Sequence, residues 1–284
     1  MRSIKEVLFG TKQEHLAHDC PLTVITEPKH GMFWRDIPKE VSTIFPELWR
    51  RKKAKTRYDL LSLPDLKGVL GDQVRYDLLV EDVLTAIGLH QAEYVAVIAG
   101  SDPNVPEGLA ERLRADPRLE GVHVSARTVE RVGFQPDALA VTCMDWRLHG
   151  VGGFLPRCVE LVGDQGIGLM TIPGVAKELS ESTVRGRVTL QVLETLVHDG
   201  LKKLTLVSHT DCGKYGGCRA FDGSLEEQMK LTHDLRQAAR FLRSRLQIDV
   251  RLALAGIEGH ACSDICGIPL TSPFSFSIGS DDDL

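Results

Sequence analysis

Three residues in the second half of the chain have the types and the order of a metal site. Cys143 follows a short apolar run at residues 138–142, and His209 follows another at 203–208, with Cys212 three positions further on. Two thiolates and one imidazole suit Zn²⁺, and three protein ligands leave a fourth position for water, as in catalytic zinc sites. The sequence therefore predicts one zinc ion per chain, bound by these three side chains.

Asp145 and Arg147 lie directly beside the first predicted ligand. If the segment is extended, alternation aims both side chains toward the same region as Cys143. A bidentate ion pair with Arg147 would hold the Asp145 carboxylate off the metal and leave it to accept a hydrogen bond from metal-bound water. Zinc lowers the pKa of such a water to about 7. We expect this pair to orient the water, and an ordinary structural ion pair is the alternative.

The two segments together resemble a known enzyme family. Residues 143–147 (Cys-Met-Asp-Trp-Arg) and 209–213 (His-Thr-Asp-Cys-Gly) resemble the C-x-D-x-R and H-x-x-C-G motifs of β-class carbonic anhydrases. The resemblance covers roughly residues 137–260 and implies the same zinc ligands, with Asp145 and Arg147 as the catalytic pair. It implies a lyase that reversibly hydrates carbon dioxide to bicarbonate by a zinc-bound hydroxide.

Departures from the family pattern leave the substrate open. Met144 and Trp146 replace small polar residues, and residues 171–179 stand where many members have an N-A-G-type loop. Relatives of this fold hydrolyse carbonyl sulfide or carbon disulfide, so that reaction at the same site is one alternative. A non-catalytic zinc-binding or regulatory protein is another, and turnover would separate it from an enzyme.

The elements that must position these residues follow from the apolar pattern. Strands are predicted at 138–142, 168–174, 203–208 and 249–256, and helices around 155–161, 180–199 and 225–246. Strands alternating with helices predict an α/β fold with a mostly parallel sheet flanked by helices. The carboxyl ends of neighbouring parallel strands meet at the sheet edge where ligands bind, which would bring Cys143 and His209 together.

The first half of the chain has a related pattern. Strands are predicted at 21–26, 58–64, 94–100 and 122–126, with a helix at 80–89. Residues 60–64 align with 169–173 without a gap, an offset of 109 (169 − 60), and the same offset aligns the later helix and strand. We predict two similar α/β halves from a degenerate internal duplication. The alternative is that the two halves are unrelated, because any two α/β units share some of the same order and spacing of strands and helices.

The first half carries no metal ligands at the matching positions. Gly100, Pro103 and Glu27 stand where His209, Cys212 and Cys143 stand in the second half. We therefore predict an α/β domain without metal at 1–134, a zinc domain at 135–275 and a disordered tail at 276–284. Members of the family are typically dimeric, so the resemblance implies a homo-oligomer or an intrachain pseudo-dimer.

Composition restricts the partners. The net charge of −5 is spread over interspersed charges, which does not indicate a nucleic-acid surface. The N-terminus does not resemble a secretory signal, and no apolar run approaches the roughly 20 residues that span a bilayer. We expect a cytoplasmic protein with no membrane or nucleic-acid partner, whose seven cysteines are thiols or metal ligands. The expected partner is the small-molecule substrate, carbon dioxide or bicarbonate.

Other polar residues near these segments are weaker candidates for a functional site. His260, Cys262 and Cys266 form a second cluster whose spacing matches no strong zinc pattern, so buried or free thiols are favoured over a second metal site. A further set surrounds the predicted ligand turn and supplies candidate pocket residues: Asp211, Lys214, Tyr215 and Cys218.

Overall fold

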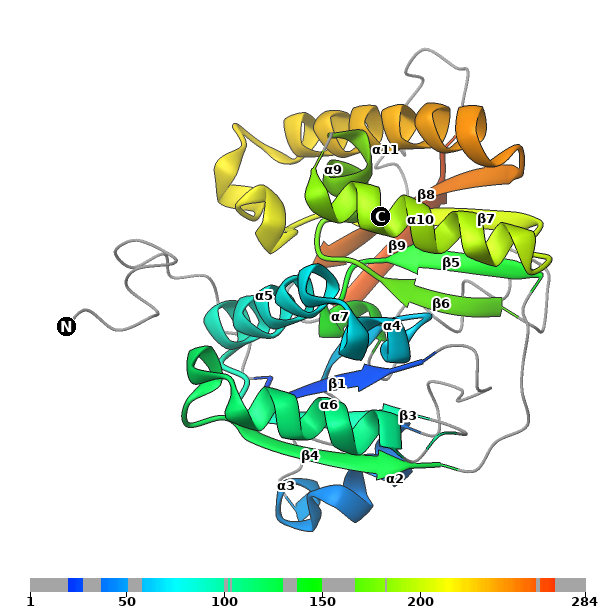
Figure 1. Ribbon diagram of the computed structural model, residues 1–284. Coiled ribbons are helices and arrows are strands. Elements are labelled where there is room, and N and C mark those ends of the chain that lie inside the picture. The colour runs from blue at the N-terminus through cyan, green and yellow to red at the C-terminus, as the bar shows by residue number, and fades with distance from the viewer. Residues whose placement is uncertain are drawn as a thin grey trace.

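Two sheets of mostly parallel strands, each flanked by helices, make up the protein in a computed structural model (Figure 1). The predicted fold class, α/β with two similar halves, is confirmed. In the described residues no helix is long and apolar enough to cross a membrane. The structure describes residues 20–27, 37–50, 58–99, 102, 104–129, 137–149, 167–181, 183–258 and 261–268.

The first half forms a four-stranded sheet in the order β2-β1-β3-β4. All neighbours are parallel: β1 (Leu22–Thr26) pairs with β2 (Asp59–Ser62) and β3 (Tyr94–Ala99), and β3 pairs with β4 (His123–Thr128). The three strands other than β4 are buried nearly throughout, as expected for apolar runs covered on both faces.

Helices cover both faces of this first sheet. One face packs against α2 (Ile37–Ile44) and α3 (Pro46–Arg50). The other packs against α4 (Leu66–Gly71), α5 (Gln73–His90) and α6 (Asn104–Ala115). The alternation of side chains along a strand divides its apolar residues between these two faces.

The second half repeats this strand order and adds one strand. Its sheet runs β6-β5-β7-β8-β9. The first four strands are parallel, and β9 pairs antiparallel with β8. Their bounds are β5 (Ala138–Thr142), β6 (Ile167–Thr171), β7 (Lys203–His209), β8 (Asp249–Glu258) and β9 (Ala261–Gly267).

One face of the second sheet is covered by α9 (Val175–Ser180), α10 (Val184–His198) and α11 (Ser224–Leu246) (Figure 1). A single turn, α7 (Trp146–His149), follows the end of β5. On the other face Val207 and Ala255 belong to the same hydrophobic cluster as apolar residues of α5. The two halves therefore share part of their core.

Corresponding strands of the two halves meet where the halves pack. The Ser62 N–H donates to Thr171 Oγ1 over 2.7 Å, and Ser62 Oγ donates to the Leu169 carbonyl over 2.6 Å. Ser62 and Thr171 are 109 residues apart, which is the offset of the sequence alignment. Contact between corresponding positions is what packing about a pseudo-twofold axis produces. An ion pair of 2.7 Å between Arg185 Nη1 and Asp82 Oδ2 joins α10 to α5.

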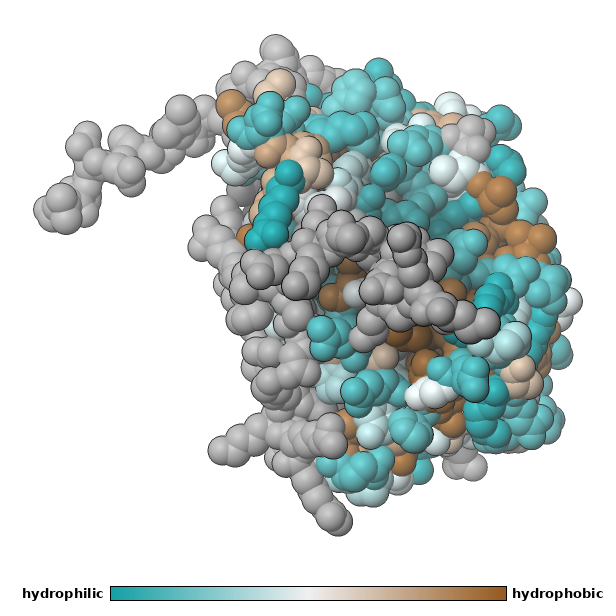
Figure 2. Space-filling model, turned by 90° about the vertical axis from the view of Figure 1, so that its left-hand side faces the viewer, coloured by the Kyte–Doolittle hydropathy of each residue, from teal (hydrophilic) through white to brown (hydrophobic). Residues whose placement is uncertain are grey.

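The surface is mostly polar on the face in Figure 2, where hydrophobic areas are small and lie between hydrophilic side chains. Scattered apolar side chains are ordinary on a globular surface. Large exposed examples are Val74, Val184, Leu225, Met229 and Phe241.

Most predicted elements in the described residues are found, with corrections at their ends. The helix predicted at 180–199 begins later, at Val184, because α10 is capped by Thr183, whose Oγ1 accepts the Gly186 N–H over 2.8 Å. Neither α9 nor β9 was predicted, and the helix predicted at 80–89 begins earlier, at Gln73. Three predictions lie outside the described residues: the helix around 155–161, the junction at 134–135 and the tail at 276–284.

Candidate metal centre

The three predicted ligands converge at the carboxyl ends of two paired strands. Cys143 follows β5 directly, His209 is the last residue of β7, and β5 pairs with β7 in parallel. One ligand atom from each of Cys143, His209 and Cys212 lies within 4.8 Å of the others, and all three residues are buried. Within the described part of the chain this is the one group of three such residues that could hold a metal ion.

A tight turn brings Cys212 back to the end of β7. Asp211 adopts a left-handed conformation with φ of 56°, and its N–H donates to Glu227 Oε1 over 2.6 Å. Thr210 fixes the other side of the turn, because its N–H donates to the Ala255 carbonyl over 3.0 Å. A short 3-10 helix, Gly213–Tyr215, then starts immediately after the cysteine. Hydrogen bonds from β8 and α11 therefore set the position of Cys212.

His209 presents one ring nitrogen to the two sulfurs. Its Nδ1–H donates to the Thr210 carbonyl over 2.8 Å. Its Nε2 is buried and has no hydrogen-bond partner among the described residues. Burial opposes a charge on this ring, but the nearby Cys143 sulfur favours it and the pKa of His209 is raised. A metal ion at Nε2 would take the place of that proton, and the fixed Nδ1–H would hold the ring in the ligating tautomer.

The two thiols are unequal when no metal is bound. The hydrogen bond between them raises the pKa of Cys143, together with burial, to well above its usual range, and lowers the pKa of Cys212. Cys212 is therefore the more easily ionised of the two buried thiols. A metal cation favours both thiolates, so these residues fit a metal better than they fit two isolated thiols.

Asp145 and Arg147 form the predicted ion pair, and it is bidentate. Arg147 Nη2 lies 2.6 Å from Asp145 Oδ2, and Arg147 Nε lies 3.0 Å from Oδ1. Both side chains are buried, at 5% and 2% exposure. Burial alone would raise the pKa of Asp145, but the Arg147 guanidinium holds it well below the usual range. The carboxylate is therefore kept ionised as an acceptor.

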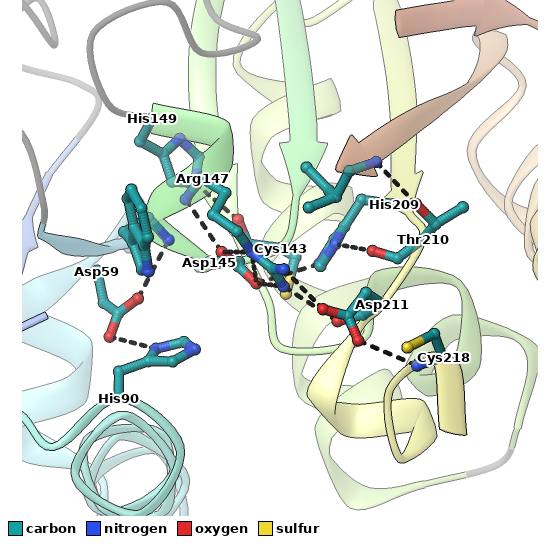
Figure 3. Close-up of polar contacts among 12 residues, drawn as sticks. Asp59, His90, Cys143, Asp145, Arg147, His149, His209, Thr210, Asp211 and Cys218 are labelled. Atoms are coloured by element: carbon teal, nitrogen blue, oxygen red, sulfur yellow. Dashed lines mark hydrogen bonds and ion pairs between the residues drawn. The ribbon is translucent and has the colours of Figure 1, made fainter. Parts of the chain in front are cut away.

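The carboxylate of this pair stands beside the ligand cluster. Asp145 Oδ2 lies 4.0 Å from His209 Nε2, and Figure 3 shows Asp145 and His209 on either side of Cys143. The segment is not extended, because Arg147 lies within α7, whose first residue follows Asp145 directly. The Arg147 N–H donates to Asp145 Oδ1 over 3.0 Å, so the start of the turn and the ion pair use the same carboxylate.

Sequence reasoning missed His149 and undervalued Asp211. His149 Nε2 donates to the carbonyl of Cys143 over 2.7 Å, and burial lowers the pKa of His149 to about 4, so the ring is neutral. Asp211 accepts from Arg147 Nη1 over 2.7 Å. His149 lies six positions after Cys143 with no spacing rule to signal it, whereas Asp211 lies within the motif itself.

The remaining sequence candidates divide into pocket residues and others. Tyr215 lines a small pocket at the cluster and donates to Asp234 Oδ2 over 2.9 Å. Lys214 pairs with Glu178 at 3.4 Å, and the Cys218 side chain is exposed. In the second His/Cys cluster, Cys262 and Cys266 lie on β9, but their side chains and all of residue 260 lie outside the described part.

Comparison with protein-family models and with curated proteins found no match. The chemistry of this centre therefore rests on its own residues. A buried imidazole nitrogen and two sulfurs can bind a metal ion. An ionised carboxylate beside them can accept a hydrogen bond from a proton-bearing ligand of that metal.

Proposed function

We propose that this protein is a zinc-dependent enzyme that reversibly hydrates carbon dioxide to bicarbonate and a proton. The observation that carries the proposal is the position of the Asp145–Arg147 ion pair beside the buried Cys143, His209 and Cys212 cluster. An ion pair fixed at a metal site has a use in orienting a reacting water, which a purely structural site does not need.

Zinc is the metal that this donor set favours. Two thiolates and one imidazole are common zinc ligands, and three of them leave one position open. When bound, zinc supplies a Lewis acid that lowers the pKa of a water to about 7. We propose one ion per chain, held by the three ligands.

Asp145 orients the nucleophile in this proposal. Both of its oxygens already accept hydrogen bonds from Arg147, so the carboxylate cannot rotate freely. It stays ionised and can accept a hydrogen bond from a water near His209 Nε2, which directs a lone pair of that water toward the substrate carbon. As a bond forms from the water oxygen to that carbon, one C=O π bond of the carbon dioxide breaks and its electron pair moves to the oxygen. The proton lost by the water passes to buffer, which leaves bicarbonate.

The pocket suits a small uncharged substrate. Beside the cluster lies a narrow space of about 150 Å³, part of it open to solvent, and its apolar lining includes Val175, Leu231 and the ring of Tyr215. The side chains leave only narrow gaps in this space, so only a small molecule could reach the cluster, and the lining must shift to admit it. Carbonyl sulfide and carbon disulfide have the same shape as carbon dioxide, so the pocket supports their hydrolysis as the nearest alternative.

The first half is proposed as an intrachain partner in place of a second subunit. The contact between corresponding residues Ser62 and Thr171 supports an internal pseudo-dimer. The packing of both halves into one cluster that contains Cys143 and Cys212 supports it further.

Stopped-flow hydration of carbon dioxide near pH 8 tests the proposal. The zinc-loaded protein is expected to turn over at least about 100-fold faster than Cys143→Ala, with one zinc per chain in the parent only. Zinc at one per chain without turnover of carbon dioxide would overturn it. The same protein would then be assayed with carbonyl sulfide and carbon disulfide, and failure with all three would favour a non-catalytic zinc protein.

A further inference from the structure

A buried ion pair from the first half lies against the turn that carries the catalytic pair. Asp59 is the first residue of β2 and His90 is the last residue of α5. His90 Nδ1 lies 2.7 Å from Asp59 Oδ2, and the side chains are 8% and 0% exposed. Burial alone would lower the pKa of His90, but Asp59 raises it to about 9, so the ring is charged at neutral pH.

The second oxygen of Asp59 reaches into the other half. The Trp146 N–H donates to Asp59 Oδ1 over 3.2 Å, and the Leu60 N–H donates to the Met144 carbonyl over 3.1 Å. These two bonds lie on either side of Asp145 in the chain. Figure 3 shows Asp59 and His90 on one side of Asp145 and Arg147, and His209 on the other. The start of β2 therefore holds the backbone on both sides of the catalytic carboxylate.

The same end of α5 also touches the second ligand segment. A Cβ placed on Gly213, the residue after Cys212, would lie 2.5 Å from Leu89 Cδ1. Leu89 directly precedes His90 in α5. The end of α5 thus contacts the second ligand segment directly and reaches the first through Asp59.

The corresponding positions of the second half do not provide the same support. The offset of 109 places Gly168 at the position of Asp59 (59 + 109) and Asp199 at the position of His90 (90 + 109). Neither replacement can form the carboxylate–imidazolium pair. Burying an ion pair brings little or no net stability, so a role beyond stability would explain why the first half has this pair where the second half has Gly168 and Asp199.

We propose that Asp59, held by His90, is a positioning residue of the metal centre, which the first half contributes to the site of the second. Asp59 anchors the turn at 144–146 so that the Asp145 carboxylate stays beside the ligand cluster. The inference rests on the proposed function only in taking Cys143, His209 and Cys212 as metal ligands. Outer partners of a metal site typically change affinity or activity by about 10–100-fold when removed.

The test uses the full-length protein with Co²⁺ in place of zinc, whose visible absorption reports the geometry around the metal. Asp59→Ala is expected to shift the Co²⁺ bands, lower Co²⁺ affinity about tenfold and lower kcat more than it changes KM. Asp59→Asn keeps an oxygen acceptor for the Trp146 N–H and is expected to restore most of the parent spectrum.

Asp82→Ala is the matched control. Asp82 is also buried, also belongs to the first half, and also forms a 2.7 Å ion pair across the interface, with Arg185. This control is expected to lose stability while its Co²⁺ spectrum and affinity remain those of the parent. If Asp59→Ala does not fold, His90→Gln supplies the comparison, with a smaller shift in the same direction.

The outcomes separate this inference from the proposed reaction. Parent-like spectra and kinetics in Asp59→Ala and His90→Gln, or equal shifts in those variants and Asp82→Ala, would overturn the positioning role. A spectrum that changes only with Asp59 and His90, in a protein that hydrates no carbon dioxide, would uphold it while the proposed reaction fails.

Discussion

Arg147 Nη1 lies 2.7 Å from Asp211 Oδ2, and this ion pair ties together two segments that are 64 residues apart in the chain. The same guanidinium binds Asp145 through Nε and Nη2. One side chain therefore fixes the Asp145 carboxylate to the turn that carries His209 and Cys212. The planar fork of an arginine can hold two carboxylates at once, whereas a lysine presents a single point charge.

Arg147→Lys is expected to lower kcat/KM for carbon dioxide by at least about 100-fold while the protein keeps one zinc per chain. Arg147→Gln leaves the buried Asp145 and the Asp211 carboxylate without their partner, and is expected to cost about 3–5 kcal/mol of folding free energy as well. Stopped-flow kinetics, metal analysis and denaturant unfolding measure these effects. Arg185→Lys, at a buried ion pair outside the site, is the control. Parent-like kinetics in Arg147→Lys would contradict the role of the bridge.

Substitution of a single predicted ligand is expected to abolish stable metal binding. Cys143→Ser or Cys212→Ser should weaken zinc affinity by at least about 100-fold, because binding energy is spread over few ligands. A chelator should lower the melting temperature of the parent but leave that of either variant unchanged, since only the parent has a metal to lose. Cys218→Ser, with its exposed side chain, should behave as the parent does. Full zinc content in Cys143→Ser after dialysis would show that the cluster is not the site.

The strand ends that place Cys143 and His209 could be predicted because local apolar runs stop at those residues and parallel strands share one edge. The bidentate Asp145–Arg147 pair could be predicted because both residues lie within one short motif. Whether the segment is extended could not be predicted, and it is not, because Asp145 Oδ1 accepts the Arg147 N–H and a helical turn begins there.

Contacts made by distant residues could not be predicted. Asp59 reaches Trp146 across 87 positions, and nothing near Asp59 in the sequence marks it as part of a site. The strand β9 was missed because an antiparallel edge strand after a parallel run carries no helix before it to signal its place. A gap-free offset could nevertheless indicate that Ser62 and Thr171 correspond, and the two residues are in contact.

Asp82 gives the stability of the interface between the halves a distinct pH dependence. Burial raises the pKa of Asp82 to about 6, although the Arg185 guanidinium partly offsets it. A raised pKa means that the folded state holds this proton more tightly than the unfolded state does. The stabilisation is full below the unfolded-state value near 4 and is lost as the pH rises through about 6.

Relative to Asp82→Asn, the parent is therefore expected to lose about 2 kcal/mol of unfolding free energy between pH 4 and pH 7. Urea unfolding of both proteins at half-unit steps of pH measures the difference between their unfolding free energies. The contributions of all other titrating groups cancel in this difference. A difference that stays constant over this range, or rises with pH, would show that Asp82 titrates normally.

Gly213 is required because Leu89 leaves no room for a side chain, and not because its own backbone needs a left-handed conformation. A Cβ at this position would lie 2.5 Å from Leu89 Cδ1, and Leu89 must move to admit it. We expect Gly213→Ala to cost about 1–3 kcal/mol of stability, as other overpacking substitutions do, and to weaken zinc binding because Cys212 precedes it. In the background of Leu89→Ala the same substitution should cost at least about 1 kcal/mol less, which a double-mutant cycle measures directly. Gly71→Ala, where a Cβ meets nothing within 4 Å, is the control and should change stability little. Additive costs in the cycle would mean that the end of α5 does not press on the ligand turn in solution.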